Sequence, residues 1–119
     1  MLNYNLLSNN QKQSIIKSQY NKIYAHELAH KKAGGALAGG IVIERNAQGI
    51  PVSGHVSIQM PKLNEANPDE TIADAKTVIN SALAPSDPSE QDYKVAAEAQ
   101  SILNKAKNIK NNQKLNYLA

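Results

Sequence analysis

One stretch of the sequence constrains the fold more than any other, because it combines helical spacing with metal-binding side chains. Residues 24–30 read Y-A-H-E-L-A-H, so His26 and His30 are four apart and Glu27 directly follows the first histidine. On an α-helix, residues four apart lie on the same face, and two imidazole nitrogens can each reach one zinc ion at about 2 Å. Glu27 lies too far round the helix to be a third ligand, but it could accept a proton from a metal-bound water. The stretch therefore predicts a helix that carries a zinc site.

The residues before this motif predict that the helix is long and that the motif faces the protein interior. Ser8 and Gln11 have the spacing of a capping box, so the helix should begin near Asn9 and continue to residue 32 or 33. The glycines at 34 and 35 suit its C-terminal end. Hydrophobic residues recur at helical spacing on the side of the motif: Ile16, Tyr20 and Ile23. The alternative, a solvated face that carries two histidines by chance, would place the motif on the opposite side.

The rest of the chain predicts an α+β fold, with one β-hairpin and two C-terminal helices after the long first helix. A strand at 41–45 and a second at about 50–60 should form the hairpin, joined by a turn that contains Gly49. Hydrophobic and polar residues alternate along the second strand, and His55 lies on its polar face. The runs N-P-D-E at 67–70 and D-P-S-E at 87–90 are typical of helix starts, so helices should begin near Pro68 and Pro88.

The composition fits one small domain. A chain of 119 residues can bury one modest core, and we expect a single domain over residues 1–107 followed by a polar, flexible tail at 108–119. Because the chain has no cysteine, a metal site must use histidine and carboxylate ligands. No signal peptide or membrane-spanning stretch is visible, which predicts a cytoplasmic protein without a membrane partner. The modest net charge of +3 and the absence of a nucleic-acid motif disfavour a nucleic-acid binder.

The sequence offers two candidates for a third metal ligand. A catalytic zinc site takes three protein ligands and leaves one position open. His55 is the only other histidine, and a hairpin folded back on the first helix could bring it to the metal, although its strand face could equally meet solvent. Asp92 lies where the last helix begins, and it is either a ligand or a first-turn carboxylate that favours the helix dipole.

Several separated motifs resemble one family of bacterial proteins. In order along the chain they are A-H-E-x-A-H at 25–30, S-G-H-V at 53–56, A-L-A-P at 82–85 and P-S-x-Q-D at 88–92. Over roughly residues 26–99, this arrangement resembles the SprA-related family, whose members are classed as candidate metalloproteases. The resemblance implies a zincin-like zinc hydrolase without naming its substrate. Family members tend to read G-G-E-V where this chain has S-G-H-V, and both glutamate and histidine can bind zinc.

Together these observations predict a zinc-dependent metallopeptidase that acts on a peptide or protein, with Glu27 as the general base. Zinc would be the cofactor, held by His26, His30 and His55, or by Asp92 in place of His55. The competing interpretation is a zincin-like binding or regulatory module that does not cleave. A chain this small offers little wall to enclose a substrate, which favours either that module or a partner chain, such as a second copy, that completes the cleft.

Overall fold

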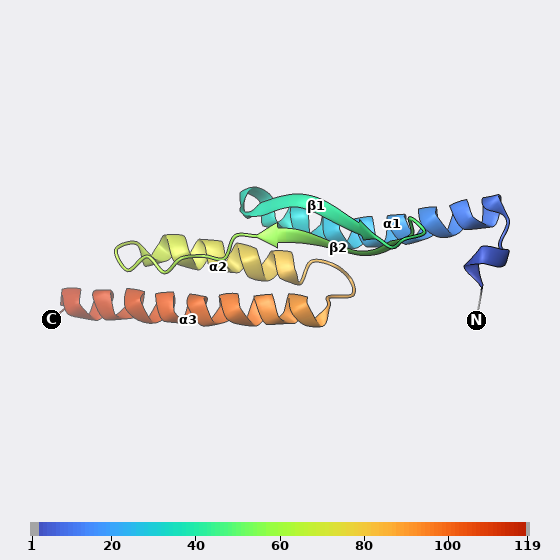
Figure 1. The fold of residues 1–119 in the computed structure, drawn as a ribbon. Helices are drawn as coiled ribbons and strands as arrows, with labels where there is room; N and C mark the ends of the chain where they lie inside the picture. The colour runs from blue at the N-terminus through green and yellow to red at the C-terminus, as the bar shows by residue number, and fades with distance from the viewer. Residues whose placement is uncertain (1–2, 119) are drawn as a thin grey trace.

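A computed structural model describes residues 3–118 and confirms the α+β fold (Figure 1). The elements in order are the 3-10 helix η1 (Tyr4–Leu6), helix α1 (Asn9–Gly34), the 3-10 helix η2 (Gly35–Leu37), strands β1 (Ala38–Arg45) and β2 (Pro51–Ile58), and helices α2 (Pro68–Ala82) and α3 (Glu90–Leu118). The molecule is elongated, with extents of 76 × 25 × 21 Å, because α1 and α3 extend beyond the middle at opposite ends. Within residues 3–118, no helix combines the length and apolar character needed to cross a membrane.

Helix α1 begins and ends as its sequence predicts. The Ser8 hydroxyl accepts a hydrogen bond from the Gln11 backbone at 3.1 Å, and the Gln11 side chain accepts one from the Ser8 backbone at 2.8 Å. This reciprocal capping box satisfies two amide groups that the first turn leaves free. Gly35 ends the helix with a φ of +53°, and its amide donates to the Lys31 carbonyl. A positive φ of this kind favours glycine over any residue with a Cβ atom.

Strands β1 and β2 form an antiparallel hairpin that packs on α1. Gly54 of β2 lies against the helix: a Cβ atom there would be 2.7 Å from Ile23 Cγ2 and 3.0 Å from Glu27 Cγ. The missing side chain thus lets the β2 backbone approach α1 beside the H-E-x-x-H motif. Because side chains alternate along a strand, the polar face of β2 points the other way, and Ser53, His55 and Ser57 are exposed.

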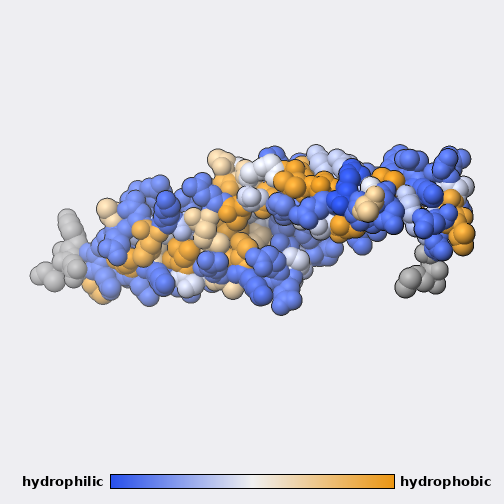
Figure 2. All heavy atoms as spheres, in the orientation of Figure 1, coloured by the Kyte–Doolittle hydropathy of each residue, from blue (hydrophilic) through white to orange (hydrophobic). Residues whose placement is uncertain are grey.

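Helices α2 and α3 lie side by side and bury the largest part of the core (Figure 1). Their buried hydrophobic residues are mostly small, which allows close packing of the two helices: Ala75, Val78, Ala82, Ala96, Ala99, Leu103 and Ala106. On the face shown in Figure 2, hydrophobic residues gather over the middle of the molecule, where the hairpin meets the helices.

Two details of these helices differ from the sequence prediction. Helix α3 begins at Glu90, two residues after Pro88, because Ser89 caps it instead of Asp87. The helical spacing of the hydrophobic residues predicts that Leu83 shares the buried side of α2, but Leu83 is 40% exposed, whereas Thr71 and Ser81 are buried. The buried hydroxyls cost little, because each is hydrogen-bonded to the backbone of a neighbouring segment.

The structure continues α3 through residues 108–118, so this segment is helical, and its flexibility stays a prediction. Its side chains hold the segment before α2 and the first turn of α2. Lys110 Nζ lies 2.7 Å from Asp69 Oδ1, and the Gln113 side chain donates to the Glu65 carbonyl at 2.7 Å. Residue 119 lies outside the described residues, and the domain limit at residue 107 stays a prediction.

Candidate metal centre

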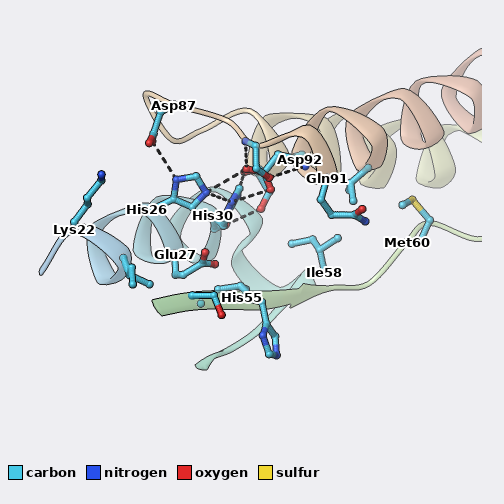
Figure 3. A pocket seen from close by; sticks show the side chains of 18 residues that line it. Lys22, His26, Glu27, His30, His55, Ile58, Met60, Asp87, Gln91 and Asp92 are labelled. Carbon is cyan, nitrogen blue, oxygen red and sulfur yellow. Dashed lines mark hydrogen bonds and ion pairs between the residues drawn. The ribbon is translucent and has the colours of Figure 1, made fainter. Parts of the chain in front are cut away.

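Three side chains bring ring nitrogens and carboxylate oxygens together above α1 (Figure 3). His26 Nε2 and His30 Nε2 are 3.1 Å apart. Asp92 Oδ2 lies 3.2 Å from the His26 nitrogen, and Asp92 Oδ1 lies 3.2 Å from the His30 nitrogen. Ligand atoms about 2.0–2.1 Å from a tetrahedral zinc ion are about 3.3 Å from one another. The spacing of these atoms therefore matches that of a zinc ligand set.

Asp92 reaches the histidine pair because of the way α3 begins. Its carboxylate Oδ2 accepts a hydrogen bond from the Ser89 backbone at 2.8 Å, and the Ser89 hydroxyl accepts one from the Asp92 backbone at 3.1 Å. This capping pair fixes the carboxylate in the first turn of α3, where only 15% of the side chain is exposed. One carboxylate thus caps α3 and faces α1.

The outer nitrogens of the two histidines are each bonded to an acceptor. His30 Nδ1 lies 2.7 Å from the Ser81 carbonyl oxygen, which can only accept, so this nitrogen carries a proton. His26 Nδ1 lies 3.1 Å from Asp87 Oδ1, and the hydrogen bond from the His26 ring lowers the pKa of Asp87, which keeps it an acceptor. In a neutral imidazole the other nitrogen then has a free lone pair. When both rings are neutral, the two Nε2 lone pairs therefore face each other and Asp92.

A cation would stabilise this arrangement of side chains. Two nitrogen lone pairs and a carboxylate lie within hydrogen-bond distance of one another, and with neutral rings no proton lies between them. Either added protons or a metal ion must compensate their mutual repulsion. Two imidazoles and one carboxylate form a donor set that zinc takes in catalytic sites. The outer bonds of both rings are also those that orient metal-binding histidines.

Glu27 lies beside this group and is 5% exposed. A carboxylate oxygen of Glu27 and one ring nitrogen each of His26 and His30 all lie within 4.8 Å of one another. Burial raises the pKa of Glu27, and the nearby rings of His30 and His26 oppose that shift. A raised pKa brings a carboxylate closer to the range in which it exchanges protons near neutral pH.

His55 does not join the group. Its side chain is 54% exposed, its Nδ1 lies 3.4 Å from Glu44 Oε1 on β1, and its ring points away from the histidine pair (Figure 3). The reason is the alternation of β2, which turns Gly54 towards α1 and the neighbouring His55 away from it. Of the two third-ligand candidates, the structure brings Asp92 and not His55 to the motif.

Two residues at this site were missed by the sequence reasoning. Ser81 is 1% exposed, its hydroxyl donates to the His30 carbonyl at 2.6 Å, and its own carbonyl accepts from the His30 ring. Asp87 begins the run D-P-S-E, which is typical of a helix start and does not indicate its contact with His26. Partners 51 and 61 residues away leave no spacing signal, and the one available clue was a serine within the buried side of α2.

A cavity of about 520 Å³ opens beside the group, which is within the range of about 300–1,000 Å³ for small-ligand pockets. Its walls come from α1, β2 with the residues that follow it, the end of α2, the loop after α2, and the first turns of α3 (Figure 3). The space is therefore continuous with His26, Glu27, His30 and Asp92.

No curated protein and no solved structure matches this chain. The model of one family, described as the SprA-related family, matches residues 6–118, which include every residue of the candidate metal centre. The chain therefore belongs to the SprA-related family.

Proposed function

We propose that this protein is a zinc-dependent metallopeptidase. The observation that carries the proposal is the convergence of two ring nitrogens and a carboxylate at 3.1–3.2 Å, with each ring held by a hydrogen bond at its outer nitrogen. H-E-x-x-H on a helix is the pattern of zinc metalloproteases, which supports a peptide bond as the substrate. The neighbouring cavity leaves room for such a substrate.

His26 Nε2, His30 Nε2 and Asp92 are the groups that would hold zinc, with Ser81 and Asp87 orienting the two rings. When bound, zinc supplies Lewis acidity and lowers the pKa of water. The three protein ligands leave one position open for substrate chemistry.

Glu27 carries the proton in this scheme. Its carboxylate takes a proton from the attacking water and later passes it to the amine nitrogen of the leaving fragment. Glu27 is suited to both steps, because burial raises its pKa and its carboxylate faces the same space as the histidine pair. Gly54 contributes by allowing β2 to cover Glu27 without pushing it aside.

The variant Glu27→Gln tests this proposal. Glutamine is nearly isosteric with glutamate, and residue 27 is not a ligand in the scheme. Zinc stoichiometry should therefore stay at about one ion per chain, which is the content of a single site. Glutamine cannot accept the proton, so cleavage of a mixed peptide library should fall by a factor of about 10²–10⁴. His26→Ala should lose zinc and cleavage together, and Glu98→Gln, an exposed glutamate on α3, is the matched control that should keep both.

Two results would reject the proposal. If the parent protein takes up no zinc, the assignment of the metal centre is wrong. If Glu27→Gln cleaves peptides as fast as the parent, the assignment of Glu27 as the general base is wrong. If the parent binds zinc but cleaves no peptide, the non-catalytic binding module becomes the better interpretation.

A further inference from the structure

The cavity beside the candidate metal centre is lined by charged residues and by a larger number of apolar ones. The charged residues that line it are Lys22, Glu27, Asp87 and Asp92, and they gather around the histidine pair. We define the apolar trough as five residues that line the cavity: Val56, Ile58 and Met60 on the hairpin side, Ala82 from α2 and Val95 from α3. Figure 3 shows Ile58 and Met60 on the opposite side of the histidine pair from Lys22.

The trough is partly open, so it can receive a side chain without unfolding. Val56, Ile58, Met60 and Val95 are each half-buried, and only Ala82 is fully buried. Apolar walls favour an apolar occupant, because a polar side chain would lose its water contacts there without gaining a partner. Gln91 offers the trough one amide, which can hydrogen-bond a peptide backbone but cannot neutralise a charge.

We propose that the trough selects peptides with a large apolar side chain, such as leucine, methionine or phenylalanine, next to the bond held at the metal centre. The inference deepens the proposed function, because it takes a peptide as the occupant of the cavity. Continuity between the trough and the group formed by Glu27 and Asp92 supports this occupant: a side chain lodged in the trough places its own backbone beside that group.

The test compares two capped tripeptides, acetyl-Ala-Leu-Ala-amide and acetyl-Ala-Asn-Ala-amide, which have middle side chains of similar shape and different polarity. Binding to the full chain is followed by methyl NMR, both without zinc and with zinc, and cleavage is followed separately. We expect the leucine peptide to shift the methyl signals of Ile58, Met60 and Val95. It should bind about tenfold or more tightly than the asparagine peptide, the lower end of what burying a leucine side chain gives.

Met60→Gln removes apolar wall with little change in size, and it should lower the leucine preference by about threefold or more. Val52→Thr is the matched control, because Val52 is 57% exposed on the same hairpin, does not line the cavity, and should leave the preference unchanged. Equal binding of the two peptides, shifts confined to other methyl groups, or a Met60→Gln variant with the parental preference would overturn the inference. So would the absence of any shift at about 10 mM peptide, tenfold above a Kd of about 1 mM.

The two proposals can fail separately in this experiment. Leucine-selective binding without cleavage keeps the trough assignment and rejects the peptidase. Cleavage of both peptides at equal rates and affinities keeps the peptidase and rejects the trough.

Discussion

Replacing Asp92 by asparagine removes the negative charge from the histidine pair while helix α3 keeps its cap. The Asp92 side chain is 15% exposed and places one oxygen 3.2 Å from each of the two Nε2 atoms. Asparagine is also a good N-terminal helix residue, and its carbonyl oxygen can still accept the hydrogen bond from the Ser89 amide. The variant therefore isolates the role of the charge from the role of the cap.

The expected loss of zinc affinity follows from the burial of the Asp92 carboxylate beside the ion that it would bind. Removing one partner of a buried charged pair costs about 3–5 kcal/mol, and partial exposure of Asp92 places it near the lower limit. Since each 1.4 kcal/mol is a factor of about ten, the Kd for zinc should rise about 100-fold. Competition against a coloured zinc chelator of known affinity, at fixed pH, measures that change.

Glu90→Gln is the matched control for this variant. Glu90 lies in the same first turn of α3, and its side chain is 89% exposed, so the substitution removes the same charge from the helix end without touching the site. Parental zinc affinity in Asp92→Asn would refute the ligand assignment. A loss of equal size in Glu90→Gln would show that the helix-end charge, and not direct binding, is responsible.

Three further predictions test the surroundings of the site. Gly54→Ala should lower the free energy of unfolding, measured in urea, by about 1–3 kcal/mol, because its Cβ atom would overpack the contact with α1. Gly40→Ala is the control, because a Cβ atom at residue 40 meets no neighbour, and it should leave this free energy unchanged. Equal losses in the two variants would contradict the close approach of β2 to α1. Ser81→Ala removes the hydrogen bond of the hydroxyl but keeps the one from the His30 ring to the Ser81 carbonyl. It should lower the free energy of unfolding by about 0.5–1.5 kcal/mol and weaken zinc binding less than Asp92→Asn does. An equal loss of zinc affinity in the two variants would count against Asp92 as the ligand and Ser81 as a residue that only orients the ring. Zinc at about 100 times its Kd should raise the free energy of unfolding by about 2.7 kcal/mol, reversibly with a chelator, and an unchanged melting curve would contradict binding to the folded state.

The parts of the fold that the sequence predicts well depend on neighbouring residues. The capping box of Ser8 and Gln11, the four-residue spacing of His26 and His30, and the alternation along β2 are each contained in one short segment, and each appears in the structure. The same holds for the start of α2 at Pro68 after Asn67, although the Asn67 side chain makes no capping bond.

The parts it could not predict depend on how distant segments meet. Strand alternation defines two faces of β2 without saying which one packs on α1, and that choice decides whether His55 or the other face meets the motif. Gly54 held a clue, since a glycine within a strand often marks a close backbone approach. Asp92 was ambiguous for a different reason, because one carboxylate both caps α3 and reaches residues 66 positions away.

The two histidines of the motif are held in different ways, and the difference indicates which half of the site the protein builds without an ion. The His30 ring is fixed by a 2.7 Å hydrogen bond to the Ser81 carbonyl, and the His30 backbone carbonyl accepts a 2.6 Å hydrogen bond from the Ser81 hydroxyl. Ser81 is almost fully buried, so water does not compete for either hydrogen bond. His26 is held by Asp87 at 3.1 Å, and the Asp87 side chain is 72% exposed, so water competes for that bond. The α2 side of the site is therefore preformed, whereas the orientation of the His26 ring would depend more strongly on a bound cation.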